Sequence, residues 1–117
     1  MLVVTRYAVP PGEAAEFRER CHSALKALVS CPGCTGATAG QALDDPALWV
    51  LSTSWESVGA YRRALSSYQV KLVAVPLMYR ALDEPSAFES LLAWTPDTGL
   101  VEHRSAIAAR HDGGGTG

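Results

Sequence analysis

Apolar residues recur with two different periods along this chain of 117 residues, and the order of those periods limits the folds open to it. Runs rich in Val, Leu and Trp are typical of strands, whereas apolar residues three or four positions apart are typical of an amphipathic helix. Strands are predicted at Leu2–Val9, Thr35–Leu43, Leu48–Trp55 and Leu77–Leu82, and helices at Gly12–Val29, at 57–74 with a break at Ser66-Ser67, and at Ser86–Ala93. The order favours an α+β fold of the ferredoxin-like kind, a four-stranded antiparallel sheet with its helices on one face.

The first strand carries apolar side chains on both of its faces. Val3, Tyr7 and Val9 alternate with Leu2, Val4 and Ala8. A strand that is apolar on both faces needs cover on both. The helices cover one face, and a chain of this size has few further residues that could cover the other. We therefore expect a homodimer in which a second copy covers the other face of the sheet.

Composition excludes several classes of function. Hydrophobic residues make up 48% and charged residues 19%, which predicts a folded core, and the net charge of −2 gives no attraction for nucleic acid or an anionic membrane. The longest uncharged stretch, Ala27–Leu43, is broken by Pro and Gly and does not read as a membrane span. The first residues show no signal-peptide pattern, so we expect a cytoplasmic protein. We place the domain at residues 1–92 and a partly flexible tail at 93–117, where half of the ten glycines lie.

The cysteines and histidines show no metal-binding spacing. Cys31-Pro32-Gly33-Cys34 follows a predicted helix, whereas redox motifs of this type precede one, where the helix dipole stabilises a thiolate. Cys21 lies on the apolar stripe of that helix, and His22 lies on its polar face. We therefore expect no metal and no cofactor, and we interpret the two motif cysteines as structural.

One segment carries a family resemblance. Trp55-Glu56-Ser57-Val58-Gly59-Ala60-Tyr61 resembles the W-E-S-x-x-A-Y/F signature of the antibiotic biosynthesis monooxygenase family, and Leu48–Leu51 and Pro32-Gly33-Cys34 also look like that family. The resemblance implies a dimeric α+β barrel. Some members oxygenate phenolic polyketides to quinones with no metal, haem or flavin, because the deprotonated substrate itself supplies electrons to O2.

The resemblance also implies site residues. Trp55 and Tyr61 match a Trp and a Tyr of the pocket in quinone-forming members, so we expect them to be catalytic. Those members carry an Asn where this chain has Leu51. The side chains that haem-degrading members use are missing at the aligned positions Thr5, Ala64 and Ala74, which argues against haem degradation.

Other candidate residues have two interpretations each. Arg6 and Arg80 interrupt apolar runs, so they either bind an acidic group of a substrate or pair with a carboxylate at an edge or interface. Trp49 and Phe17 are expected to line the substrate site. Trp55 and Tyr61 themselves are also compatible with a purely structural role, because aromatic residues at this spacing are often core.

Three hypotheses of function remain. The first is a cofactor-independent monooxygenase that acts on an aromatic or polyketide-type small molecule with O2. The second is a non-catalytic small-molecule-binding or accessory dimer on the same fold, and the third is a polyketide cyclase. An open cavity with several converging polar groups would favour an enzyme, whereas a space filled by apolar side chains would favour the accessory protein.

Overall fold

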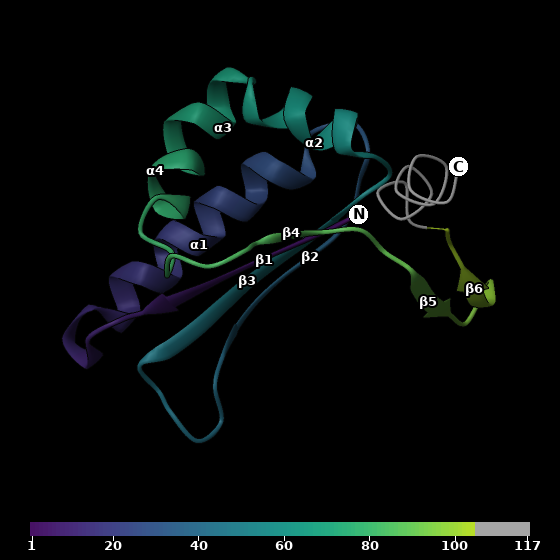
Figure 1. Cartoon of the computed structure of the whole chain (residues 1–117). Coiled ribbons are helices and arrows are strands. Elements are labelled where there is room, and N and C mark those ends of the chain that lie inside the picture. The colour runs from purple at the N-terminus through teal and green to yellow at the C-terminus, as the bar shows by residue number, and fades with distance from the viewer. Residues whose placement is uncertain (105–117) are drawn as a thin grey trace, which may run out of the picture.

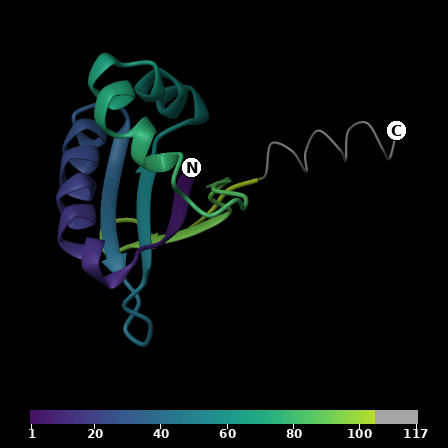
Figure 2. The same cartoon turned by 90° about the vertical axis from the view of Figure 1, so that its left-hand side faces the viewer.

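A four-stranded antiparallel sheet with helices on one face forms the body of the protein, as the sequence predicts. The computed structural model describes residues 1–104. Figure 1 shows the helices gathered on one side of the strands, and Figure 2 shows the same two layers from the side. The elements in chain order are β1 (Leu2–Ala8), the short 3-10 helix η1 (Pro11–Glu13), α1 (Ala14–Val29), β2 (Cys34–Gln41), β3 (Leu48–Trp55), α2 (Val58–Leu65), α3 (Tyr68–Val73), α4 (Val75–Met78), β4 (Ala87–Phe88), β5 (Leu92–Thr95) and β6 (Gly99–Glu102).

The strand order is β2-β3-β1-β4, and every pair is antiparallel. The strand β3 was predicted with both of its ends, because its alternating pattern is long and carries two tryptophans. Its inward side chains are buried, whereas those between them are half-buried. The register places Thr5 opposite Leu51 and Tyr7 opposite Trp49, so the inward residues of β1 and β3 form one continuous surface beneath the helices.

The fourth strand is not where the sequence analysis placed it. Residues Leu77–Leu82 do not form a strand: α4 ends at Met78, and a turn follows. A short apolar run cannot be assigned to helix or strand by pattern alone, and Pro76 suits the first turn of a helix. In α4 the side chain of Leu77 is fully buried, which favours the helical conformation here.

The segment after α4 supplies the edge of the sheet instead. The predicted helix at Ser86–Ala93 is also wrong, because Ala87–Phe88 pairs with β1 as β4. Two further backbone hydrogen bonds extend this pairing, from the Leu82 N–H to the Arg6 carbonyl (2.8 Å) and from the Val4 N–H to the Ser86 carbonyl (2.7 Å). Pairing with an open strand edge satisfies more backbone groups than an isolated turn of helix would.

The core lies between the sheet and the helices. The break between α2 and α3 falls at Ser66-Ser67, as predicted, and both helices begin at serines, Ser57 and Ser67, whose side chains cap them. The buried apolar side chains come from both layers: Val3, Tyr7, Val9, Phe17, Cys21, Ala24, Ala27, Leu28, Trp49, Leu51, Trp55, Ala60, Ala64, Val70, Ala74 and Leu77.

Beyond β4 the chain forms a small antiparallel hairpin of β5 and β6, which lies away from the sheet (Figure 1). Its large apolar side chains Leu92, Trp94 and Leu100 are exposed. This hairpin begins the segment for which the sequence analysis expected a tail, and the glycine-rich end of that tail lies outside the described residues. Within residues 1–104, no helix combines the length and the hydropathy needed to cross a membrane.

Candidate functional site

Trp55 and Tyr61 lie against each other where β3 leads into α2. Trp55 ends β3, and Tyr61 follows on α2, whose start is fixed by the Ser57 cap. Their ring centroids are 5.5 Å apart, with an angle of 51° between the rings. Trp55 is buried, and its indole Nε1 donates to the Thr53 hydroxyl at 2.8 Å, so the ring is held from both sides. Tyr61 is half-buried and is the member of the pair that keeps some contact with solvent.

A buried pair of hydroxyl groups lies on the inward face of β1. The Tyr7 and Thr5 hydroxyls are 2.8 Å apart, and the Thr5 hydroxyl also donates to the Leu51 carbonyl at 3.4 Å. Sequence analysis placed Tyr7 among the apolar core residues and did not select it as a candidate. The available signal was the presence of two hydroxyl-bearing residues at successive inward positions of an otherwise apolar strand.

Burial keeps both tyrosines protonated in neutral solution. It raises the pKa of Tyr61, and it raises the pKa of Tyr7 although the hydrogen bond with Thr5 acts in the opposite direction. Negative charge on Cys21 or Tyr61 would raise the Tyr7 pKa further. A phenol with a raised pKa can donate a hydrogen bond to a substrate anion, but it is a poor acceptor of a proton at neutral pH.

An aromatic row continues from Tyr7 toward the far end of β3. The Tyr7 and Phe17 ring centroids are 5.1 Å apart, and Phe17 meets Trp49 edge-on at 5.3 Å. Phe17 is buried, and the Arg80 guanidinium lies 5.7 Å from its ring centroid. Such tilted and edge-on contacts are favourable beyond the area they bury. The row fills the space that a substrate would otherwise take at this point of the core.

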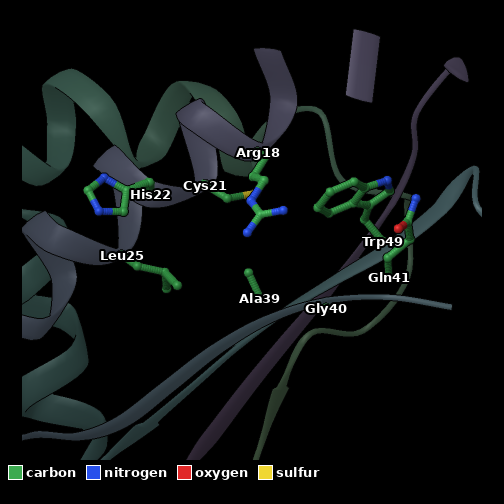
Figure 3. A pocket seen from close by; sticks show the side chains of 8 residues that line it. All are labelled: Arg18, Cys21, His22, Leu25, Ala39, Gly40, Gln41 and Trp49. Carbon is green, nitrogen blue, oxygen red and sulfur yellow. The ribbon is translucent and has the colours of Figure 1, made fainter. Parts of the chain in front are cut away.

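An open pocket of about 400 Å³ lies next to this row, between α1 and the strands β2 and β3 (Figure 3). Arg18 reaches from α1 toward the strands, and the Trp49 ring stands at one side. Ala39 and Gly40 of β2 are small and leave room beneath the helix. The residues that line the pocket are Arg18, Cys21, His22, Leu25, Ala39, Gly40, Gln41 and Trp49.

The wall of the pocket carries an unsatisfied polar group. The Trp49 Nε1 is buried without a hydrogen-bond partner, and it is the one such side-chain atom within residues 1–104. A buried unpaired donor is costly in a folded protein. The Trp49 indole N–H is therefore an unused hydrogen-bond donor at this wall.

The pocket approaches the buried hydroxyls through Cys21. This residue lines the pocket, and its side chain is part of the same buried core as Tyr7. Burial raises the pKa of the Cys21 thiol, so the thiol is protonated in neutral solution. Cys21 is therefore a residue that both lines the pocket and belongs to the buried core that contains Tyr7.

Sequence analysis selected one residue of this pocket and missed three polar ones. Trp49 was a candidate, whereas His22 was placed on the polar face of its helix, and Arg18 and Gln41 were not selected as candidates. A helical polar face becomes a pocket wall when the strand beneath it has small side chains. The run of Ala, Gly and Thr in β2 was the signal that could have shown this.

The two candidate arginines lie elsewhere and both pair with carboxylates. Arg6 donates to Glu84 through Nε (2.7 Å) and through a terminal nitrogen (2.8 Å), on the face of the sheet opposite the helices. Arg80 lies after α4 and not on a strand, and it is 3.8 Å from the Glu13 carboxylate. Of the two interpretations given for these arginines, the structure shows the one in which each side chain pairs with a carboxylate. Within residues 1–104, no group of three or more His, Cys, Asp or Glu side chains could hold a metal ion.

Comparison with known families finds one match over most of the folded domain. The profile of the family described as antibiotic biosynthesis monooxygenase matches residues 1–74. A comparison with curated proteins found no match.

Solved structures with the same arrangement of helices and strands come from several organisms. SnoaB, a cofactor-independent oxygenase from Streptomyces nogalater, is 25% identical, with a TM-score of 0.61 over 69% of this chain and 82% of SnoaB. A conserved protein from Methanosarcina mazei is 24% identical, with a TM-score of 0.61 over 74% of this chain and 84% of that one. A Nitrosomonas europaea protein provisionally named antibiotic biosynthesis monooxygenase is 16% identical, with a TM-score of 0.62 over 77% of this chain and 97% of that one. The last two likenesses show the fold alone.

Proposed function

Because this chain belongs to the antibiotic biosynthesis monooxygenase family, we propose that it is a cofactor-independent monooxygenase that acts on an aromatic, polyketide-type small molecule. The observation that carries the proposal is the pocket beneath α1, which has an indole wall and a cationic side chain and which shares Cys21 with the buried core that contains Tyr7. The likeness to SnoaB, a cofactor-independent oxygenase, supports the same reaction class.

The pocket suits a flat substrate that is bound as an anion. Trp49 offers an aromatic surface, and Arg18 offers a positive charge that favours the deprotonated form of a phenol. His22 lines the same pocket and carries a ring nitrogen that can accept a proton, so it is the proposed acceptor of the substrate proton. Tyr61 is the proposed hydrogen-bond donor to the developing oxygen anion, with Trp55 as the residue that holds its ring in place.

The proposed reaction needs no external electron donor. A deprotonated, electron-rich anthrone-type methylene carbon gives its electrons to O2 and forms a carbon–oxygen bond. The oxygen–oxygen bond then breaks, one oxygen atom remains as the quinone carbonyl, and the other leaves as water with the two hydrogens of the methylene group. The protein's tasks are to stabilise the anion and to limit bulk water around it.

The assembly that we propose is a homodimer, arranged as the dimeric α+β barrel of the family. On the sheet face opposite the helices, Leu2 and Phe88 are 37% and 45% exposed, and Val4, Leu48 and Val50 are half-buried. An apolar sheet face is stable in water only with cover. We also propose residues 1–92 as the domain and 93–117 as its extension. The cytoplasmic location stays a prediction.

Light scattering tests the dimer. Val50→Lys places a charge in the middle of the uncovered face, beside Arg6 in the register, and is expected to give monomers. Ala15→Lys, at an exposed position of α1, is the matched control and should leave the dimer intact. A wild-type protein that is monomeric at micromolar concentration would refute the proposed assembly.

One observation favours a second candidate, the non-catalytic small-molecule-binding or accessory dimer. The inward space beneath α2 is filled, and the polar atoms there pair with one another, Thr5 with Tyr7 and Thr53 with Trp55. Leu51 is buried between them and offers no side-chain hydrogen bond where quinone-forming relatives carry an Asn. Such a protein would bind the same ligands in the pocket without consuming O2.

Oxygen uptake separates the two candidates. The protein is incubated with a panel of anthrone-like phenols and a metal chelator, and O2 is recorded beside ligand binding by tryptophan fluorescence. Saturable, enzyme-dependent uptake supports the monooxygenase. Binding without uptake across the panel supports the accessory protein, and product without uptake would indicate a cyclase.

A further inference from the structure

The turn between α1 and β2 has a cysteine at each end. The Cys34 N–H donates to the Cys31 carbonyl at 3.3 Å, which closes a four-residue β-turn. Pro32 occupies its second position, and Gly33, with a φ of 90°, occupies its third. This is the pattern of a type II turn, in which the third residue must adopt a positive φ and is usually Gly.

This turn brings the Cα atoms of the two cysteines close together. The end residues of a β-turn have their Cα atoms less than about 7 Å apart, and a disulfide needs about 4.4–6.8 Å. Both thiols are free in the structure and partly exposed. Their hydrogen bonds point elsewhere, from Cys31 to the Ala27 carbonyl (3.5 Å) and from Cys34 to the Gly36 carbonyl (3.6 Å). Pairing them therefore requires rotation of both side chains out of these contacts.

We infer that Cys31 and Cys34 form a reversible dithiol–disulfide site that exchanges with small-molecule disulfides of the glutathione type. The thiolate of one cysteine attacks the glutathione disulfide and releases one glutathione thiol. The second cysteine attacks the resulting mixed disulfide and releases the other glutathione thiol. Two electrons and two protons pass from the protein to the oxidised glutathione, and one sulfur–sulfur bond forms as another breaks. A turn that already holds both ends together favours the second step over accumulation of the mixed disulfide.

The site lies directly behind the Trp55–Tyr61 pair. Cys34 is opposite Trp55 in the register of β2 and β3, and the Gly33 carbonyl accepts a hydrogen bond from the Glu56 N–H at 2.8 Å. The turn also packs against α2 closely, since a Cβ placed on Gly33 would be 2.6 Å from the Ala60 Cβ. A disulfide would therefore stiffen the support of the helix start that positions Tyr61. This inference does not depend on the proposed oxygenase activity.

The third cysteine is an internal control. Cys21 is buried on the inward stripe of α1, and burial raises the pKa of its thiol, so it should react slowly with the same disulfide. The buried thiol and the two turn thiols should therefore differ in their rate of reaction within one folded chain.

The test is oxidation of the full, folded chain by oxidised glutathione, followed by alkylation of remaining thiols and peptide mapping by mass spectrometry. Circular dichroism follows the fold throughout. The expected product has lost two hydrogen atoms in mass, contains a Cys31–Cys34 link, and returns to the dithiol with dithiothreitol. Cys34→Ser should stop at a glutathione mixed disulfide on Cys31, whereas Cys21→Ser should behave like the wild type. Stable mixed disulfides on both turn cysteines, a link that includes Cys21, or no reaction with the folded chain would overturn the inference.

Discussion

Tyr61→Phe separates a catalytic role of the Trp55–Tyr61 pair from a structural one. The substitution keeps the ring that packs at 5.5 Å from Trp55 and removes the hydroxyl alone. No residue within 1–104 forms a hydrogen bond with that hydroxyl, so the folded protein loses no internal partner. The free energy of unfolding should therefore change by less than about 1 kcal/mol, the net value of a typical hydrogen bond.

The effect on turnover should be much larger. Burial raises the pKa of Tyr61, so its proposed role is to donate a hydrogen bond to an anion that develops in the reaction. A hydrogen bond to a charged group contributes about 1.5–3 kcal/mol, which corresponds to a roughly 10- to 150-fold loss of kcat. The substrate's KM should change little if this bond forms mainly in the transition state.

The assay measures turnover on a confirmed substrate and the urea midpoint on the same samples. Tyr68→Phe is the matched control, because Tyr68 is 74% exposed on α3 and away from the pair. Unchanged turnover in Tyr61→Phe would remove this residue from the site and favour the accessory protein. A large loss of stability together with turnover would show that the hydroxyl is structural.

Three further predictions concern other parts of the fold. Trp49→Phe removes the unpaired buried indole N–H, so the free energy of unfolding should change by less than about 1.5 kcal/mol. The affinity for an aromatic ligand, measured by ligand fluorescence or calorimetry, should fall roughly 2- to 12-fold. Gly33→Ala should destabilise the protein by about 1–3 kcal/mol in urea titrations, because it combines a positive φ with a clash against Ala60, and an unchanged midpoint would contradict the turn assignment. Glu84→Gln tests the exposed ion pair with Arg6, and this pair lowers the pKa of the Glu84 carboxyl. A carboxyl whose pKa is lowered by folding stabilises the fold at pH values above the ordinary pKa of Glu. That contribution is lost as pH falls through the lowered pKa. The free energy of unfolding should thus be slightly larger for the wild type than for the variant at neutral pH and equal for the two in strong acid. Added salt should reduce the difference.

Long elements with a clear period could be predicted from the sequence. The strand Leu48–Trp55 and the helix ending at Val29 were predicted well because each carries a repeated apolar pattern that only one conformation can bury. The segment from Leu77 to Phe88 could not be predicted, because its conformation depends on partners distant in sequence. Leu77 is buried by α1 and its neighbours, and Ala87 and Phe88 are strand only because β1 offers them an open edge.

The candidate site was predicted in part for the same reason. The contact of Trp55 with Tyr61 follows from a short local segment, a strand end, a capping serine and one turn of helix. The pocket beside Trp49 does not, because it depends on the small side chains of β2 lying beneath Arg18 and His22. Partners such as Glu84 for Arg6 are seventy-eight positions away, and no local pattern indicates them.

The most direct test of the proposed monooxygenase is to supply isotopically labelled O2 with an anthrone-type substrate and metal chelator, and to follow the label in both products. The proposed reaction predicts one labelled oxygen atom in the quinone carbonyl and the other in water, at a rate proportional to the protein concentration. Label absent from the quinone, or incorporation at the same rate without the protein, would contradict it.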